Sequence, residues 1–400
     1  MNHNRVRRSV DFLITLLSGA VFISFSIAAE DVSGFKPEKL REIEAAISES
    51  INARNLPGAV ICIGHREHLY LKSFGNRSLA PEKSPMTVDT IFDAASLTKV
   101  IATAPSIMLL VERGKIASLD DPVKNYIKEF DREGREKITI RHLLTHTSGL
   151  RAGISPNPPW NGYDTGIKLA CAEKPRTAPG TNFLYSDINF ILLGEIVHRV
   201  SGMPLNEFAE KEIFIPLKMF DTGFLPQKEK ISRIAPTQFI GKEMLRGVVH
   251  DPVARNMGGV AGHAGVFTTA SDLARFCRMF LNNGELDGVR ILKPETVRLM
   301  RTVQTTNLEA KRGLGWDIDS GYSKPRGKLF PIGSYGHTGF TGTALWIDPY
   351  SQVFWIFLSN RVHPDGKGNV LALEYFLGTL VAEAINGVNY SEINTENKSK

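Results

Sequence analysis

The sequence has little of what builds disulfide frameworks or nucleic-acid surfaces. Its 400 residues include only three cysteines, Cys62, Cys171 and Cys277, which are too few and too far apart for a disulfide framework. Cys62 and Cys277 lie in apolar runs typical of buried thiols, and the sequence leaves open whether any two of the three form a disulfide. The net charge is +6, and Lys and Arg residues are scattered along the chain, so we expect no nucleic-acid partner.

Other familiar patterns are missing as well. No G-x-S-x-G motif occurs, which argues against an α/β-hydrolase. Internal repeats and low-complexity linkers are also absent. Hydrophobic residues make up 42% of the chain and charged residues 22%, which is typical of a globular protein. The length suits one large domain or two subdomains.

The first 29 residues have the pattern of an export signal. Three arginines within residues 5–8 precede the apolar stretch "FLITLLSGAVFISFSIAA". This order predicts a signal peptide over residues 1–29, cleaved after Ala28 or Ala29. The alternative is an uncleaved membrane anchor, because the apolar run is nearly long enough to span a bilayer. In both cases we expect the rest of the chain outside the cytoplasm, periplasmic or extracellular, and a membrane as partner only if the segment stays uncleaved.

Strand patterns occur near both ends of the chain, and helical patterns fill the middle. Two strands are expected at 59–64 and 68–75, and another two within 343–360 around an Asp-Pro turn. The segment 154–166 is rich in Pro, Gly and Asn and is expected to be a loop. Apolar periodicity and capping residues predict helices at 37–52, 94–110, 188–202, 268–284 (with Thr269 or Ser271 as cap) and 370–385. The segment 138–150 is expected to start like a strand and continue as a helix that Gly149 stops.

These patterns predict an α/β (α+β) fold. One mostly antiparallel sheet is assembled from both ends of the chain and flanked by helices, and a helical subdomain is inserted between its two halves. We expect one domain over residues 30–385, followed by a mobile polar tail over 386–400. The functional site is expected between the sheet and the helical subdomain.

A serine and a lysine stand three residues apart in "FDAASLTKV" (92–100): Ser96 and Lys99. On a helix, residues with this spacing share a face. If Ser96 lies in the first turn, its hydroxyl is near free backbone N–H groups and the positive end of the helix dipole. Burial would lower the pKa of Lys99, which could then accept the serine proton.

The spacing alone is a weak indication of function, because Ser33 and Lys36 show it too, beside the predicted cleavage site. Small residues before Ser96 leave room for a substrate, and the apolar helix that follows can bury Lys99. The alternative is a partly buried helix with a hydrogen-bonded serine and a lysine that extends toward solvent.

Two further segments complete a set of motifs. "PGTNFLYSDINF" contains Tyr-Ser-Asp at 185–187, at the start of a helix, and "YGHTGFTG" contains His-Thr-Gly at 337–339. Serine hydrolases with Ser-x-x-Lys require a Ser/Tyr-x-Asn group and a Lys-Thr-Gly strand around the nucleophile. The chain therefore resembles the superfamily of class C β-lactamases, penicillin-binding proteins, serine D-Ala-D-Ala peptidases and related esterases. The resemblance covers roughly residues 35–385 and includes "LTHTSGL" and "GGVAGHAGVFTTASDLARF".

The resemblance implies catalytic roles for three residues. Ser96 would attack the acyl carbon, while Lys99 and Tyr185 share general-base and general-acid duty. A tyrosine has an ordinary pKa of about 10, so it is useful only if nearby cations favour its phenolate. Lys99 and a protonated His337 could supply that field. The backbone N–H groups of Ser96 and Phe340 would form the oxyanion hole.

The resemblance also implies a substrate-binding wall on the His-Thr-Gly strand. Gly339 would let the strand lie close to the substrate, and Thr338 would hydrogen-bond a substrate carboxylate. His337 stands where many members of the superfamily have lysine, so its hold on a carboxylate would depend on pH.

Asp187 departs from the usual asparagine. An ionised Asp accepts hydrogen bonds and cannot donate one to a substrate amide, which weakens the case for an efficient β-lactamase. Asp187 would also favour a protonated Lys99 and so move the base role to Tyr185. We further expect Asp187 to cap the helix that follows it.

Three histidines are candidates for metal ligands or substrate contacts. His142 and His146 are four residues apart, a spacing that can bind zinc on one helix face. The glutamate of H-E-x-x-H is missing and no third ligand is obvious, so structural roles are favoured. His263, on the glycine-rich segment 258–265, is expected to pack in its loop rather than face a substrate.

The predicted reaction is acyl transfer through an ester on Ser96, followed by hydrolysis, with no metal and no organic cofactor. We expect a small acyl substrate, most simply a D-Ala-D-Ala-type peptide or a β-lactam. A carboxylesterase of the same fold is the first alternative, because Asp187 and His337 depart from the usual pattern. A penicillin-binding sensor that is acylated without turnover is the second.

Overall fold

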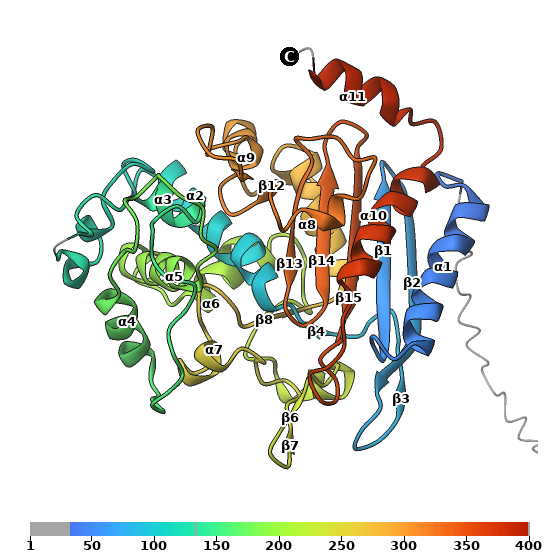
Figure 1. Ribbon diagram of the computed structural model, residues 1–400, viewed down its shortest axis with the longest axis horizontal. Coiled ribbons are helices and arrows are strands. Elements are labelled where there is room, and N and C mark those ends of the chain that lie inside the picture. Colours follow the sequence, from blue (N-terminus) through green and yellow to red (C-terminus); the bar gives the residue numbers. More distant parts are fainter. Residues whose placement is uncertain (1–32, 133, 399–400) are drawn as a thin grey trace, which may run out of the picture. The chain divides into compact units, whose positions relative to one another are not determined.

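The computed structural model describes residues 33–132 and 134–398, all within one unit, Asp31–Lys400. The predicted signal peptide or anchor over residues 1–29 lies outside the described residues. Figure 1 shows a sheet with helices on both faces and a region of mostly helical structure beside it.

An eight-stranded antiparallel sheet combines strands from the N-terminal and C-terminal parts of the chain (Figure 1), in the order β11-β12-β13-β14-β15-β1-β2-β3. β1 pairs with β15, placing Ala59 opposite Ser359 and His65 opposite Val353. The predicted assembly from N- and C-terminal segments is therefore confirmed. The strands are β1 (Gly58–His65), β2 (His68–Ser78), β3 (Ser84–Pro85), β11 (Lys311–Arg312), β12 (Asp317–Asp319), β13 (Tyr335–Gly339), β14 (Thr343–Asp348) and β15 (Val353–Ser359).

The central strands are buried on both faces, which explains their nearly continuous apolar sequences. Val60 and Cys62 of β1 belong to the core on one face of the sheet. Ile61 and Ile63 belong to the core on the other face. Because successive strand residues point to opposite faces, a strand covered on both sides needs apolar residues at every position.

Three helices cover the two faces of the sheet. α1 (Pro37–Asn52) and α10 (Leu371–Ala384) lie side by side on one face (Figure 1). α8 (Ala270–Leu281) packs against β1 and β15. Thr269 is its N-cap and accepts the backbone N–H of Asp272 at 3.2 Å, one of the two capping residues that the sequence predicted.

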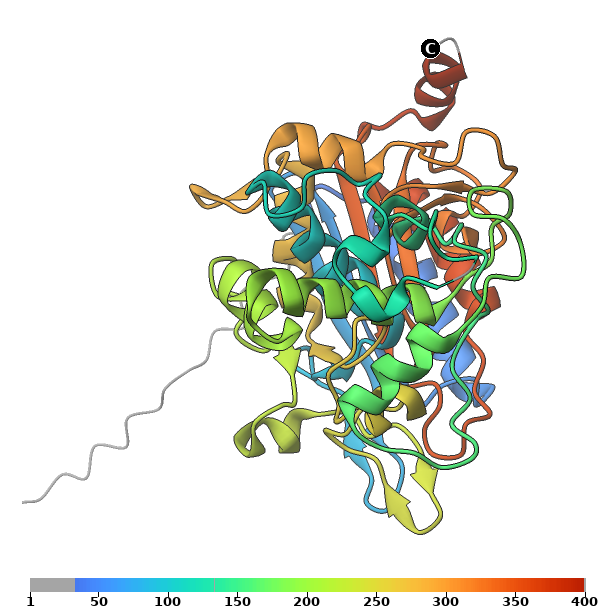
Figure 2. The same cartoon turned by 90° about the vertical axis from the view of Figure 1, so that its left-hand side faces the viewer.

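The remaining helices lie mostly between β3 and β11 in the sequence and form the region that faces the viewer in Figure 2. This is the predicted inserted helical region. Its helices, together with the C-terminal α11, are α2 (Ala104–Glu112), α3 (Ile140–Leu144), α4 (Tyr163–Ala172), α5 (Asp187–Ser201), α6 (Leu205–Ala209), α7 (Pro252–Asn256), α9 (Pro294–Arg301) and α11 (Tyr390–Lys398).

Short strands, five 3-10 turns among the described residues and the π-helical turns η2 and η5 complete the fold. The strands form the small sheet β4-β8-β5 and the hairpins β6-β7 and β9-β10. Their bounds are β4 (Phe92–Asp93), β5 (Gly223–Phe224), β6 (Phe239–Ile240), β7 (Glu243–Met244), β8 (Val266–Thr268), β9 (Glu285–Leu286) and β10 (Val289–Arg290). The turns are η1 (Ala95–Leu97), η2 (Lys99–Thr103), η3 (Val123–Asn125), η4 (Lys128–Phe130), η5 (Glu210–Phe214), η6 (Lys228–Arg233) and η7 (Lys324–Arg326).

The segment Ala95–Glu112 spans η1, η2 and α2 and contains both Ser96 and Lys99. It is long and apolar enough to cross a membrane, with a mean hydropathy of 1.3, but 83% of it is buried inside the fold. A core helix of a folded domain has the same composition, because all of its faces contact other residues.

Two predicted boundaries are wrong in detail. The segment 154–166 is loop only in its first part, because α4 begins at Tyr163. The helix expected within 138–150 is reduced to α3, which ends at Leu144. Beyond it His146 has φ 58°, a left-handed conformation that a continuing α-helix cannot contain.

The residues expected to form a polar tail contain α11. Tyr390 at its start is buried beside Phe330, and its hydroxyl donates to Ser351 Oγ at 3.1 Å. The contacts of Tyr390 with residues distant in sequence anchor this segment. The polar composition of the segment does not predict them. All three cysteines are free and buried, which settles the question of pairing that the sequence left open.

Candidate active site

Ser96 lies in η1, a short 3-10 turn that continues into η2 and α2. Ala95 before it has φ 46°, a conformation that costs a non-glycine residue roughly 1–3 kcal/mol. Asp93 stabilises this turn by accepting the backbone N–H of Ala95 at 2.9 Å and that of His250 at 2.7 Å. Burial raises the pKa of Asp93 to about 6, so this carboxylate is ionised at neutral pH.

The β13–β14 hairpin lies directly against the turn that carries Ser96. Thr341 Oγ1 donates to the backbone oxygen of Asp93 at 2.8 Å, and Thr343 Oγ1 donates to that of Ala94 at 3.1 Å. A Cβ at Gly339 would lie only 2.6 Å from the Ala94 oxygen. Glycine is therefore required because the strand approaches the nucleophile turn itself.

Lys99 is fully buried beneath Ser96. Its Nζ donates to Ser96 Oγ at 2.9 Å and to the backbone oxygen of His263 at 3.0 Å, and it lies 2.7 Å from Asp187 Oδ1. Burial acts to lower the pKa of Lys99, but the charges of Asp187 and Tyr185 and their hydrogen bonds outweigh it and raise the pKa. The expectation that burial would make Lys99 neutral is wrong, because the Asp187 carboxylate retains the ammonium proton.

Tyr185 closes the site just before α5. The imidazole of His146 stacks on its ring at 4.4 Å between centroids, and Lys99 Nζ lies 5.1 Å from the ring centroid. Burial raises the pKa of Tyr185, while the charge of Lys99 and hydrogen bonds to Ser96 and Lys99 act in the opposite direction. The pKa remains above its ordinary value, so Tyr185 is a phenol at neutral pH.

Asp187 is the first residue of α5, and its backbone N–H donates to the Ala152 oxygen at 2.6 Å. The N-cap position belongs to Ser186, whose hydroxyl donates to the Arg151 backbone oxygen at 2.6 Å and caps nothing. The predicted capping role of Asp187 is wrong, because its carboxylate is engaged by the buried ammonium of Lys99.

His337 is buried within β13, and its Nδ1 lies 2.7 Å from the backbone oxygen of Thr338. Burial, together with the positive charges of Arg312 and Lys99, holds the pKa of His337 well below its ordinary range. The imidazole is therefore neutral. The expectation of a protonated His337 that supports a phenolate or holds a carboxylate is wrong, because two cations already lie near it.

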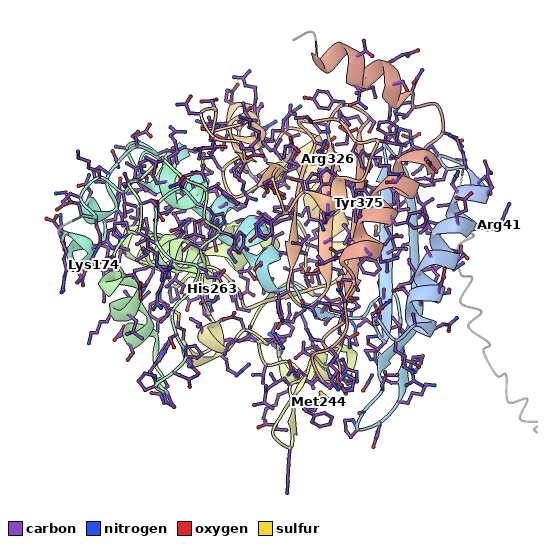
Figure 3. All side chains as sticks on the ribbon, viewed as in Figure 1. Arg41, Lys174, Met244, His263, Arg326 and Tyr375 are labelled. Carbon is purple, nitrogen blue, oxygen red and sulfur yellow. The ribbon has the colours of Figure 1, made fainter. Side chains whose placement is uncertain are left out.

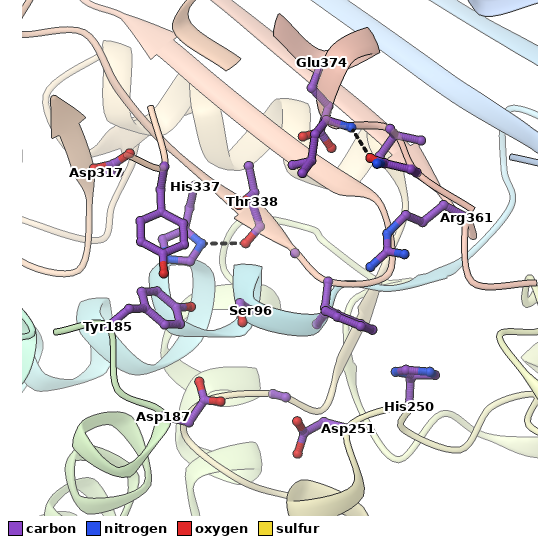
Figure 4. Close-up of a pocket in the computed structure, with 18 of the residues that line it drawn as sticks. Ser96, Tyr185, Asp187, His250, Asp251, Asp317, His337, Thr338, Arg361 and Glu374 are labelled. Atoms are coloured by element: carbon purple, nitrogen blue, oxygen red, sulfur yellow. Dashed lines mark hydrogen bonds between the residues drawn. The ribbon is translucent and has the colours of Figure 1, made fainter. Parts of the chain in front are cut away.

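One cleft of about 720 Å³ is lined by most of the predicted site residues (Figure 4). Lys99 lies beneath it, in hydrogen-bond contact with Ser96. The structure thus brings together every residue for which the sequence predicted a catalytic or substrate-binding role. The predicted residues that line the cleft are Ser96, Tyr185, Asp187, His337, Thr338, Gly339 and Phe340.

The cleft also contains residues that no motif indicated. The ring of Phe340 is 63% exposed and stacks on His250 with centroids 5.6 Å apart. The guanidinium of Arg361 lies 4.5 Å from the centroid of the same ring. Glu374 of α10 reaches the cleft from the far C-terminal part of the chain. No local signal could have identified Arg361 or Glu374, because their neighbours in the cleft are distant in sequence.

The two histidines considered for zinc belong to separate hydrogen-bond networks. His142 Nδ1 accepts the backbone N–H of Thr139 at 3.1 Å and closes a capping box at the start of α3. His146 lies beyond the end of that helix, and its Nδ1 accepts the backbone N–H of Ser186 at 3.0 Å. The helical spacing on which the zinc alternative depends is therefore not formed. The "LTHTSGL" segment instead supplies the imidazole that stacks on Tyr185.

His263 is buried in its loop, as the sequence favoured (Figure 3), and its Nε2 lies 2.9 Å from Asp251 Oδ1. Together with Asp187 these residues place possible ligand atoms within 4.8 Å of one another. Each already has a protein partner, and the ammonium of Lys99 supplies the positive charge beside Asp187. We therefore assign no metal to this cluster.

The fold and the site are those of a hydrolase family. The chain belongs to the β-lactamase family, whose model matches residues 43–379. A protein of Escherichia coli O157:H7 that carries the provisional name D-alanyl-D-alanine carboxypeptidase is 31% identical over 386 residues, covering 87% of this chain and 88% of the relative.

Solved structures show the same fold. The octameric penicillin-binding protein homologue from Pyrococcus abyssi is 26% identical with a TM-score of 0.69, covering 86% of this chain and 77% of that chain. EstCE1, a hydrolase with promiscuous acyltransferase activity, is 20% identical with a TM-score of 0.69, covering 86% of this chain and 98% of that chain. At this identity the second likeness is one of fold alone.

Proposed function

We propose that the protein is an exported serine hydrolase that forms an ester between Ser96 and the acyl group of its substrate. The observation that carries this proposal is the 2.9 Å contact of Lys99 Nζ with Ser96 Oγ at the floor of a cleft that Tyr185 also lines. A nucleophile, a group that can exchange its proton and a substrate-sized space are the minimum that covalent acyl transfer requires.

In the proposed first step, Tyr185 has lost its phenolic proton to solvent, and Ser96 Oγ attacks the acyl carbon while its own proton passes to the Tyr185 phenolate. The negative oxygen of the tetrahedral intermediate is bound by the backbone N–H groups of Ser96 and Phe340. Tyr185 then returns the proton to the leaving group as the carbon–leaving-group bond breaks. Water attacks the ester in the same geometry, which regenerates Ser96 and releases the acid.

The protonation states decide which group serves as the base. Lys99 and Tyr185 interact strongly, so they titrate as a pair. Because Asp187 holds the ammonium of Lys99, the proton that leaves the pair comes from the Tyr185 phenol. The pKa of both groups is raised, so the competent form becomes more abundant as pH rises. We therefore expect kcat/KM to increase toward alkaline pH.

Among acyl substrates we favour peptides that end in D-Ala-D-Ala. The name of the Escherichia coli relative and the proposed export both support this class. A carboxylesterase is the second candidate, and Asp187 is the observation that favours it. This carboxylate is directed at Lys99 and has no proton to donate to a substrate amide, whereas an ester requires no such donor.

The test is acylation followed by mass spectrometry. The protein is incubated with a fluorophosphonate, a labelled penicillin and a short-chain nitrophenyl ester, and hydrolysis of the ester, of nitrocefin and of a D-Ala-D-Ala peptide is measured in parallel. We expect an adduct on Ser96 and turnover of at least one substrate. Ser96→Ala should lose both, whereas Ser33→Ala, which removes a serine with the same Ser-x-x-Lys spacing, should lose neither.

The other possible results would argue against part of the proposal. A permanent adduct on Ser96 without turnover would identify a sensor rather than a hydrolase. Adduct formation on another residue, or on none, would refute the acyl-enzyme. Export is tested separately, by sequencing the N-terminus of the protein recovered outside the cytoplasm, which is expected to start after Ala28 or Ala29.

A further inference from the structure

Most cations around the cleft are already neutralised by carboxylates of the chain. The ion pairs are Lys99 with Asp187, Arg312 with Asp317 at 2.9 Å, and Lys367 with Asp365 at 2.8 Å. Arg361 also lines the cleft, but it forms no ion pair with any carboxylate of the described residues. Arg361 is therefore a positive charge that the folded chain itself leaves unbalanced.

The guanidinium of Arg361 is held in place while most of its N–H donors stay available. Its Nη1 donates to the backbone oxygen of Gly368 at 2.7 Å, and its Cζ lies 4.5 Å from the centroid of Phe340, which stacks on His250. A guanidinium has five N–H donors in a rigid plane, and this arrangement engages one of them. The others remain for a planar anion, for which arginine is well suited.

Glu374, which lines the same cleft and whose charge interacts with that of Arg361, is the second unusual group. It lines the cleft although its residue is only 2% exposed, and its carboxyl group forms no hydrogen bond or ion pair within the described residues. Burial raises the pKa of Glu374 to about 8, while the charge of Arg361 acts to lower it. At neutral pH it is therefore a carboxylic acid, which can donate a hydrogen bond as well as accept one.

We propose that Arg361 and Glu374 form a subsite that binds a carboxylate of the substrate, on the side of Ser96 away from Tyr185 (Figure 4). The inference rests on the proposed acyl-transfer function and specifies its substrate class: acyl compounds that carry a free carboxylate. The guanidinium supplies the charge and parallel N–H donors, and protonated Glu374 donates a further hydrogen bond. This assignment replaces His337, which is neutral and cannot hold an anion by charge.

The subsite has an expected pH dependence. When Glu374 ionises, its negative charge competes with the substrate carboxylate for Arg361. His250, whose pKa burial lowers to about 4, stays neutral throughout the range from pH 6 to 9, and the Lys367–Asp365 pair at the rim stays balanced. Asp251 stays ionised, because its pKa is held low by His263 despite burial. The pKa of Glu374 lies within this range, so its carboxyl group changes charge between these pH values.

The experiment compares ligands that differ only in a carboxylate. The substrates are an acyl-D-Ala-D-Ala peptide and its C-terminal amide, with a neutral nitrophenyl ester as the reporter of acylation. Acetyl-D-alanine and its amide are tested as competitive inhibitors of ester hydrolysis, so that the subsite is measured even if the peptide is not turned over. In Arg361→Gln we expect KM or Ki for the free carboxylates to rise roughly tenfold to a hundredfold, with the amides and the ester unchanged.

Two variants control for structure. Arg361→Lys keeps the charge and should recover part of the affinity, and Lys367→Gln removes a cleft cation that is already paired and should change little. Equal effects of Arg361→Gln on acid and amide, or no effect on either, would overturn the inference. The failure of the proposed function would look different, because wild-type protein would then hydrolyse no ester and form no adduct on Ser96.

The contribution of Glu374 is tested by pH. In the wild type, KM or Ki for the free carboxylates should rise between pH 7 and 9, and in Glu374→Gln, which keeps a donor but cannot ionise, it should stay level. A wild-type value that does not change over this range would remove Glu374 from the subsite. Thermal unfolding of each variant confirms that it is folded before its kinetics are compared.

Discussion

The two sides of the cleft around Ser96 handle charge in opposite ways. On the Tyr185 side, the ammonium of Lys99 is paired with Asp187 and buried. On the Arg361 side, a cation and a carboxyl group face the cleft with no ion pair between them or to other described residues. Charges satisfied within the protein can hold and move protons at fixed positions, whereas charges left unbalanced are available to a ligand. The contrast separates groups suited to chemistry from groups suited to recognition.

The largest expected effect is a loss of kcat/KM on substitution of Tyr185. Tyr185→Phe removes the hydroxyl that exchanges the proton of Ser96, so kcat/KM should fall by about 10²–10⁴-fold. The loss should be equal for substrates with and without a carboxylate, as measured by steady-state kinetics. Tyr322→Phe is the matched control, since its ring lines the cleft 5.2 Å from that of Tyr185 but has no proposed proton to transfer. A loss confined to carboxylate substrates would contradict the division between the two sides.

The next effect concerns the stability cost of the Arg361 side. A glutamate has an ordinary pKa near 4.3 in the unfolded chain, and burial raises the pKa of Glu374 to about 8 in the folded protein. The ionisation of Glu374 therefore has no effect on the free energy of unfolding below pH 4. Its contribution lowers that free energy as pH rises from 4 toward 8 and beyond. Glu374→Gln should raise the free energy of unfolding by about 2–5 kcal/mol at pH 9 and by little at pH 4, as measured by urea denaturation.

A control on the same helix sharpens this result. Glu383 of α10 is partly exposed and pairs with Lys39 at 2.8 Å. Glu383→Gln removes a surface ion pair, which is worth at most about 1 kcal/mol. If Glu374→Gln is no more stable than the wild type at pH 9, the carboxyl group is not buried as described.

A smaller effect is expected on the pH dependence of kcat/KM when the charge of Asp187 is removed. The charge of Asp187 raises the pKa of both Lys99 and Tyr185. Asp187→Asn removes that charge, so both pKa values fall and the acid limb of the kcat/KM profile moves to lower pH. Asp365→Asn, which changes a carboxylate at the opposite rim, should leave the limb where it is. A shift of the Asp187→Asn profile to higher pH would contradict the proposed base.

The smallest expected effect is a change in unfolding free energy at Thr269, which does not line the cleft. It shows how a change in stability alone affects the kinetics. Thr269 caps α8 on the sheet. Thr269→Ala should cost about 1 kcal/mol of unfolding free energy, while Thr269→Ser keeps the capping oxygen and most of the stability. Both variants should retain wild-type kcat/KM. A change in the pH profile of either would show that the two sides of the cleft are coupled to the N-terminus of α8.

Much of the fold followed from local patterns. α1 runs over the predicted residues 37–52, and α5 ends at Ser201, followed by Gly202 in a left-handed conformation. The catalytic motifs were recognisable because each is short and appears in a fixed order along the chain. The charge states were not predictable in the same way. The sequence predicted a protonated His337 beside Tyr185. In the structure burial, together with the charge of Arg312 from 25 positions earlier, lowers the pKa of His337 and makes it neutral.

Local sequence patterns predicted the sheet, the helices on its faces and the identity of the groups around Ser96, because periodicity and short motifs depend on neighbours along the chain. Contacts between distant segments explain why Asp187 pairs with Lys99 instead of capping its own helix, and why Arg361 and Glu374 line the same cleft. Protonation and ion pairing depend on burial and on charges a few ångströms away in space. Those neighbours come from segments that are far apart in sequence.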